Sequence, residues 1–318
     1  MRISVAMCTY NGARFLREQL DSIGAQSLPP DELVVCDDGS SDETTGIIRE
    51  FAQSASFAVR LVVNEEKLGP ARNFEKALTL CQGDLIAFGD QDDYWYPEKL
   101  KRLSRVMEGN ETLGGIFSDA DLMDEASKQS GSRLWERVQF RSPEHTVHAE
   151  GFLASRLLKG DVVTGATLMI RAAVRDLILP IPEAWMHDGW IAWMLVLYSG
   201  IAAVNEPLIR YRVHNAQHAG VSPGTLMGRI GYARRTGRAN CLPTLRQFEE
   251  LRAHWIAHPG RYFQVHLDQI EQKIAYLHYR MNLPSNFLKR LFQVTFAYDR
   301  YRRYANGSAT MWKDILVN

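Results

Sequence analysis

The sequence predicts an α/β fold with a mostly parallel central sheet, helices on both faces of that sheet, and a helical C-terminal extension. Three observations support this prediction. Short apolar runs alternate with amphipathic segments from Ile3 to Met107, as in sheets whose parallel strands are joined by helices. Aspartate-rich turns follow several of the apolar runs. From Gly224 onward the pattern becomes helical, with arginine and aromatic residues throughout.

The elements of the first third follow from these alternations. Strands are expected in four short, β-rich runs at 3–8, 32–36, 57–64 and 84–90. Helices are expected between and after them at 12–26, 43–53, 69–81 and 97–107. Pro70 and Pro97 suit the first turn of a helix, and Ser41 or Asp42 suits the N-cap of the helix at 43–53.

The rest of the chain is less regular. The runs at 114–124 and 161–171 predict strands, 188–200 predicts an apolar helix, and 202–214 predicts a strand, a turn and a second strand. The apolar residues at 127–159 recur with only weak periodicity, which predicts a mobile loop region. We therefore expect a first domain at 1–224 and a basic, aromatic-rich helical extension at 225–318.

Composition narrows the class of protein. The 318 residues carry 37 basic and 37 acidic side chains, but residues 225–318 hold 15 Lys and Arg against 6 Asp and Glu. This imbalance predicts that the preceding part of the chain is acidic and uses a cation, and that the basic C-terminal part is suited to contact an anionic surface. The four cysteines have no metal-site spacing and are expected as free thiols. No signal-peptide pattern and no long apolar run occur, so a cytoplasmic protein is expected.

Three polar loops should meet at one edge of the sheet. "CTYNG", "CDDGSSD" and "GDQDD" each follow a predicted strand, and the carboxyl ends of parallel strands form the ligand-binding edge of such sheets. A helix cap explains one carboxylate of the last loop but not three. Mg²⁺ or Mn²⁺ binds a few carboxylates together with substrate phosphate oxygens, so this loop predicts a metal–phosphate site. No GxGxxG or GxxxxGK[ST] pattern occurs, which argues against dinucleotide and P-loop sites.

These loops, with "GPARN" between them, resemble the nucleotide-sugar domain of glycosyltransferase family 2 over about residues 3–213. The resemblance implies the GT-A fold and inversion at the anomeric carbon. The "DQDDYW" form is most similar to bacterial rhamnosyltransferase-like members, which build O-antigen and other surface polysaccharides. Gly89 stands where those members often have serine.

The resemblance also implies roles for individual residues. Asp188, in "WMHDGW", would be the catalytic base, and Asp92 would bind Mg²⁺ or Mn²⁺ with His214 as a further ligand. The donor-binding residues would be Thr9, Tyr10, Asn11, Asp38, Arg72, Asn73, Asp90, Gln91, Asp93 and Arg212. Structural roles are the alternative for three of these residues. Asp188 or Asp93 would then cap a helix, and His214 would be a structural side chain. Trp185 and Trp190 would either stack on acceptor sugars or simply pack.

The leading hypothesis is a metal-dependent inverting glycosyltransferase that uses a nucleoside-diphosphate sugar, such as dTDP-rhamnose, and a saccharide or lipid-linked saccharide acceptor. The alternatives are a noncatalytic nucleotide-sugar-binding module and a nucleotidyltransferase. A module that had lost activity should lack Asp92 or Asp188, and both are present. The C-terminal run "FLKRLFQVTFAYDRYRRY" would either pack on the first domain or contact an anionic membrane peripherally. No nucleic-acid-binding motif accompanies the basic charge.

Overall fold

The computed structural model describes residues 1–141, 150–214, 241–260 and 263–316. The chain divides into two compact units, one of residues 1–150 and 162–222, the other of 151–161 and 223–318. No described helix is long and apolar enough to cross a bilayer.

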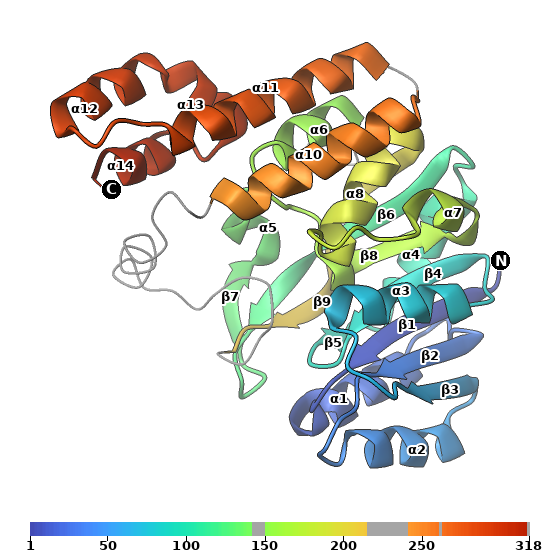
Figure 1. Cartoon of the computed structure of the whole chain (residues 1–318). Helices are drawn as coiled ribbons and strands as arrows, with labels where there is room; N and C mark the ends of the chain where they lie inside the picture. Colours follow the sequence, from blue (N-terminus) through green and yellow to red (C-terminus); the bar gives the residue numbers. More distant parts are fainter. Residues whose placement is uncertain (142–149, 215–240, 261–262, 317–318) are drawn as a thin grey trace. The chain divides into compact units, whose positions relative to one another are not determined.

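The first unit is built on one curled sheet (Figure 1). Its strands are β1 (Ile3–Thr9), β2 (Glu32–Asp37), β3 (Ala58–Val63), β4 (Leu85–Asp90), β5 (Tyr94–Trp95), β6 (Leu113–Met123), β7 (Gln129–Arg133), β8 (Leu168–Arg171) and β9 (Gly200–Arg212). Their order is β3-β2-β1-β4-β8-β6-β9-β5, with β7 paired to β6. Strands β1 to β4 are parallel, and β8 is antiparallel to both of its neighbours. The GT-A fold predicted from the sequence is confirmed. The sheet is mostly parallel, and the C-terminal part of the chain that follows it is helical.

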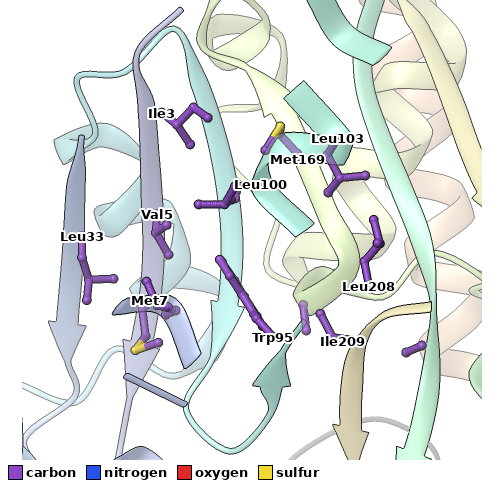
Figure 2. Packing of buried hydrophobic residues seen from close by; sticks show 14 of the residues in the cluster. Ile3, Val5, Met7, Leu33, Trp95, Leu100, Leu103, Met169, Leu208 and Ile209 are labelled. Atoms are coloured by element: carbon purple, nitrogen blue, oxygen red, sulfur yellow. The ribbon is translucent and has the colours of Figure 1, made fainter. Parts of the chain in front are cut away.

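Helices cover both faces of this sheet. In order they are α1 (Ala13–Gly24), α2 (Thr44–Ser54), α3 (Pro70–Leu80), α4 (Lys99–Glu108), α5 (Leu134–Arg137), α7 (Arg175–Ile178) and α8 (His187–Tyr198), with 3₁₀ turns at Gly165–Thr167 and Ala172–Val174. Successive side chains of a strand point to opposite faces of the sheet, and this decides which helices each side chain packs against. Ile3, Val5 and Met7 of β1 pack in one buried cluster with α1, α2 and α4. Figure 2 shows these three side chains in the cluster with Leu100 and Leu103 of α4.

The opposite face carries the alternate side chains. Phe88 of β4 lies against Phe74 of α3 and His187 of α8, with ring centroids 5.9 and 5.8 Å away. A buried tryptophan, Trp95 on β5, belongs to the same buried cluster as the β1 side chains and Leu100 of α4. The two-residue strand β5 thus joins the acidic loop after β4 to the core.

Several sequence predictions need correction. The segment 161–171 becomes a 3₁₀ turn followed by the short strand β8, and 202–214 contains the single long strand β9 rather than two strands. The described part of 127–159 holds β7, α5 and α6 (Glu150–Leu157) instead of an irregular loop, while residues 142–149 lie outside the described residues. Strand pairing with β6 keeps β9 extended through Pro207, where its register shifts.

The second unit is helical. Its remaining elements are α10 (Cys241–Ala257), α11 (Phe263–Met281), α12 (Phe287–Phe296), α13 (Tyr298–Tyr304) and α14 (Ser308–Leu316). Helices α10 and α11 pack along each other, and α14 packs against α12 and α13. Buried Asp314 accepts hydrogen bonds from Arg280 of α11 and Tyr301 of α13 at 2.7–2.8 Å. These polar contacts tie the three helices together.

Candidate active site

The ends of neighbouring parallel strands place the polar loops together. Cys8 of β1 lies opposite Asp90 of β4, and Thr9 lies opposite Asp37 of β2. The Thr9 hydroxyl donates a hydrogen bond of 2.7 Å to the Asp37 carboxylate. Gln91 reaches back to β1, where its Oε1 accepts a hydrogen bond from the Tyr10 N–H at 2.9 Å. The three loops therefore share one edge, as the strand pattern predicts.

Strand β9 supplies the fourth side of this site. Its last residue, Arg212, donates its backbone N–H to Asp93 Oδ1 at 2.9 Å. Two residues later, His214 Nε2 lies 2.7 Å from Asp92 Oδ2. Residues more than a hundred positions apart in the sequence thus meet at the acidic loop.

The Arg212 side chain is fully buried and holds this loop in place. Its guanidinium donates to the Asp92 carbonyl at 2.6 Å, to Glu18 at 2.6 Å and to the Asp124 carbonyl at 3.1 Å. It also lies 4.4 Å from the centre of the Phe15 ring. These contacts favour a positioning role for Arg212, and donor binding by its side chain stays a prediction.

Asp92 and His214 can serve as ligands of a divalent cation. Their side chains are 17% and 9% exposed, so both reach the surface of the site. Among the described residues no cluster of three His, Cys, Asp or Glu side chains forms a complete metal site. An incomplete protein set fits Mg²⁺ or Mn²⁺, which usually takes one or two carboxylates and completes its shell with waters and substrate phosphates.

Burial and mutual repulsion perturb the other aspartates of the loop. Burial, with the Asp92 and Asp188 charges, raises the pKa of Asp90 to about 7. The pKa of Asp93 is also raised, mainly by burial, and its Oδ2 has no hydrogen-bond partner among the described residues. A bound cation would relieve this repulsion, because it favours the charged form of nearby carboxylates.

Asp188 lies in the first turn of α8, where the helix dipole favours a negative charge. Its Oδ1 accepts the Gly189 N–H at 2.8 Å and its Oδ2 accepts the Gly165 N–H at 3.3 Å. Loss of solvation still raises the pKa of Asp188 above the ordinary 3.8. Its charge also acts on Asp90. A carboxylate with a raised pKa beside the acidic loop has the properties of a general base.

His187, the neighbouring residue, is packed rather than exposed. Its ring stacks on Phe74 with centroids 3.9 Å apart, and burial lowers its pKa to about 3. It is therefore a neutral side chain. A Cβ placed on Gly165 would lie 2.4 Å from His187 Nε2, so only glycine lets the 165–167 turn approach α8 this closely.

A buried lysine, Lys99, belongs to the site although the sequence reasoning did not single it out. Its Nζ donates to the Ala166 carbonyl at 2.7 Å and lies 3.3 Å from the centre of the Trp95 ring. Burial lowers its pKa, while the charges of Asp93 and Asp90 act in the opposite direction. The available signal was a lysine six residues after Asp93 on the buried face of an amphipathic helix.

The predicted nucleoside side combines buried and exposed residues. Asp38 accepts hydrogen bonds from Asn64, Leu68 and Gly69 at 2.7–2.9 Å. Asn64 also donates to Asn73 at 2.8 Å. Both carboxylate oxygens of Asp38 thus have protein partners, and the Asp38 and Asn73 side chains are nearly fully buried. These contacts favour a role in shaping the loop, and their direct contact with the donor stays a prediction.

More exposed groups lie around this network. The Tyr10 ring is 42% exposed and carries the Lys67 ammonium 3.5 Å from its centre. Arg72 forms an exposed ion pair of 2.7 Å with Glu75. Asn11, in the left-handed region at φ 46°, accepts the Ser41 N–H at 2.8 Å. Tyr10, Lys67 and Arg72 are thus exposed and can meet a nucleotide, and Lys67 was missed by the sequence reasoning.

The two tryptophans near Asp188 are packing residues in this structure. Trp185 and Trp190 are 4% and 1% exposed, with ring centroids 5.8 Å apart. The Trp190 indole N–H donates to the Ile178 carbonyl at 2.8 Å. Of the two roles left open by the sequence, the structure favours packing.

Comparisons with known proteins agree with this geometry. The family Glycosyl transferase family 2 matches residues 4–177. The putative teichuronic acid biosynthesis glycosyltransferase TuaG of Bacillus subtilis is 29% identical over 67% of this chain and 79% of its own. The UDP-Glc:alpha-D-GlcNAc-diphosphoundecaprenol beta-1,3-glucosyltransferase WfgD of Escherichia coli is 26% identical over 66% of this chain and 77% of its own. Other relatives are matched over 66%, 52% and 61% of their lengths, so the chain spans only part of several of them.

Solved structures share the fold at lower identity. S. aureus TarS 1-349 in complex with UDP-GlcNAc superposes with a TM-score of 0.61 at 17% identity, over 96% of this chain and 82% of that one. The mannosyltransferase PcManGT from Pyrobaculum calidifontis, in complex with GDP-Man and Mn²⁺, gives 0.52 at 17% identity, over 98% and 85%. The family match covers more than half of the chain and includes all three strand-end loops. This chain therefore belongs to glycosyltransferase family 2.

Proposed function

We propose that the protein transfers a sugar from a nucleoside-diphosphate donor to a hydroxyl of a saccharide acceptor, with inversion at the anomeric carbon. The single observation that carries the proposal is the joint position of Asp92 with His214 at one strand-end loop and of Asp188 nearby. The first pair suits a diphosphate-bound cation, and Asp188 suits the removal of a proton from the attacking hydroxyl.

The chemistry needs both parts of the site. Departure of a nucleoside diphosphate develops negative charge on the leaving oxygen, and a bound Mg²⁺ or Mn²⁺ would stabilise that charge. The chain itself would hold that cation through Asp92 and His214, with Arg212 keeping the loop in place. Asp188 would accept the proton of the acceptor hydroxyl as the sugar bond forms.

Donor and acceptor are proposed only by class. TarS binds UDP-GlcNAc and PcManGT binds GDP-Man, whereas the sequence resemblance suggests dTDP-rhamnose. WfgD acts on a diphosphoundecaprenol-linked sugar, which supports a lipid-linked saccharide acceptor and a part in bacterial surface polysaccharide synthesis, such as that of O-antigen. Binding without catalysis is the alternative, and the retention of Asp188 beside the acidic loop disfavours it.

The proposal can be tested with UDP-glucose, UDP-GlcNAc, GDP-mannose and dTDP-rhamnose as donors and polyprenyl-diphosphate-linked saccharides as acceptors. Mass spectrometry of the product should show addition of one sugar, and NMR should show the inverted anomeric configuration. Asp188→Asn should keep donor affinity and lower turnover about a hundredfold or more. Normal turnover by this variant would remove Asp188 as the base, and a retained configuration would refute the inverting mechanism.

A further inference from the structure

Helix α12 exposes a continuous row of large apolar side chains. Leu288, Phe292 and Phe296 are 71%, 63% and 76% exposed. A spacing of four residues places all three on one side of a helix. The Phe292 and Phe296 rings touch, with centroids 4.3 Å apart.

The same helix buries an arginine. Arg290 is 4% exposed, and its guanidinium donates to the carbonyls of Ile315, Pro284 and Ser285 at 2.8–3.1 Å. Val294, one turn further, is fully buried on that side. A surface helix usually turns its apolar side inward. The Arg290 contacts hold α12 with Arg290 turned inward and its row of apolar side chains turned toward solvent. The packing of this unit therefore keeps the two phenylalanines exposed.

Helix α14 also exposes large apolar side chains. Trp312 and Leu316 are 58% and 68% exposed and lie four residues apart on one side of α14, which packs against α12. Phe287, the first residue of α12, and Tyr298, the first residue of α13, are 48% and 50% exposed. We call these seven side chains the α12–α14 apolar surface. Exposed apolar surfaces of this kind mark interaction sites.

The charge on these helices indicates the partner. Between Phe287 and Leu316, the basic side chains outside the buried Arg290 are Lys289, Arg300, Arg302, Arg303 and Lys313. The acidic ones are the exposed Asp299 and the buried Asp314, which is paired with Arg280. Lys289 and Lys313 directly follow the exposed Leu288 and Trp312. Aromatic and leucine side chains next to basic ones are the composition of helices that bind at the interface of an anionic bilayer.

We propose that the α12–α14 apolar surface inserts into the interface of an anionic membrane and holds the enzyme at a lipid surface. The phenylalanines, tryptophan and leucines would enter the boundary between headgroups and acyl chains, while the basic side chains would contact lipid phosphates. This proposal deepens the proposed function, because it would bring the enzyme to a lipid-linked acceptor. The binding itself requires neither donor nor metal.

Co-sedimentation of the full chain with vesicles tests the proposal. The probes are vesicles of phosphatidylcholine alone and of phosphatidylcholine with phosphatidylglycerol. The double variant Phe292→Ser with Phe296→Ser should bind the anionic vesicles about tenfold or more weakly than wild type. The matched control is Ile256→Ser with Val265→Ser, which removes two apolar side chains of similar exposure, 53% and 56%, from α10 and α11. The control should bind as wild type does.

Three results would overturn the proposal. One is no preference of the wild type for anionic vesicles, and another is equal binding by the double variant and the control. The third is a wild-type dimer in analytical ultracentrifugation that the double variant converts to a monomer, since a second copy would then cover this surface. Circular dichroism checks that both variants fold. Calorimetry with UDP, GDP and dTDP separates the two proposals, because the double variant should keep its affinity for nucleotide even where vesicle binding is lost.

Discussion

At the residue scale, the acidic loop has a buried basic neighbour whose charge opposes that of the aspartates. Lys99 lies under the loop, and its charge lowers the pKa values of Asp90 and Asp93 against the larger effect of burial. Its hydrogen bond to the Ala166 carbonyl also connects α4 to the turn that contacts Asp188. One side chain thus links the two halves of the candidate site.

Replacement of Lys99 by methionine should therefore be costly. Removal of one partner from a buried charge cluster costs about 3–5 kcal/mol, so Lys99→Met should lower the free energy of unfolding by about that amount. Chemical denaturation followed by tryptophan fluorescence measures it. Lys101→Met is the control, since Lys101 pairs with Glu98 near the surface and should cost less than about 1 kcal/mol. Equal effects of the two substitutions would show that Lys99 is no counter-charge.

Asp188 predicts the pH dependence of turnover. A base acts only when deprotonated, and loss of solvation raises the pKa of Asp188 above 3.8. Activity should therefore fall as pH drops, with an apparent pKa in kcat/KM above that of an ordinary aspartate. A profile of kcat/KM against pH measures this. An activity that stays level down to pH values near 3.8 would contradict the assignment.

At the scale of elements, the sequence predicts the parallel strands and the helices after them far better than the second half of the sheet. Strands β1 to β4 are local units of apolar strand, polar turn and amphipathic helix, so their patterns are visible in short windows. Strand β7 is polar and pairs with β6 across a short turn. Strand β5 has two residues and forms because the distant strand β9 supplies its hydrogen-bond partners. No local pattern contains that information.

The same distinction applies to the candidate site. Asp92 and Asp188 were predicted as site residues because their motifs are compact, and their roles stay predictions. Lys99 and Lys67 were missed because their significance depends on contacts with Ala166 and Tyr10 that only the fold creates. For Asp38 and Arg212, the sequence could not reveal that backbone N–H groups and carbonyls already occupy most of their hydrogen-bonding atoms.

The close contact between the 165–167 turn and α8 gives a prediction about Gly165. An added methyl group would meet the His187 ring, which is itself confined by Phe74 and Phe88. Gly165→Ala should displace the turn and weaken the hydrogen bond from Gly165 to Asp188, at a cost of about 1–3 kcal/mol in stability. Turnover measurements should show kcat lowered about tenfold or more, because small displacements of a catalytic group are costly.

Gly46→Ala in α2 is the matched control. The nearest atom to its added methyl group would be the end of the Glu43 side chain, at 3.5 Å. Alanine is also the better helix former, so this variant should be as active as wild type and equally or more stable. Equal turnover by the Gly165 and Gly46 variants would contradict a role for the turn in positioning Asp188.

At the scale of the whole molecule, the two units differ in chemistry. The first carries the strand-end loops and the acidic site, and it contains most of the residues matched to the family. The second is a set of helices held by buried polar contacts, with apolar and basic side chains exposed on α12 and α14. The opposite charge balance of the two parts of the sequence reflects this division.

The central claim is that the acidic loop binds a nucleoside diphosphate together with a divalent cation. Calorimetric titration of UDP, GDP and dTDP into the full chain, with and without Mn²⁺, tests it most directly. At least one nucleotide should bind about tenfold or more tightly with Mn²⁺, and Asp92→Ala should abolish that difference. Binding that is independent of Mn²⁺ for all three nucleotides, or unchanged coupling in Asp92→Ala, would contradict the account.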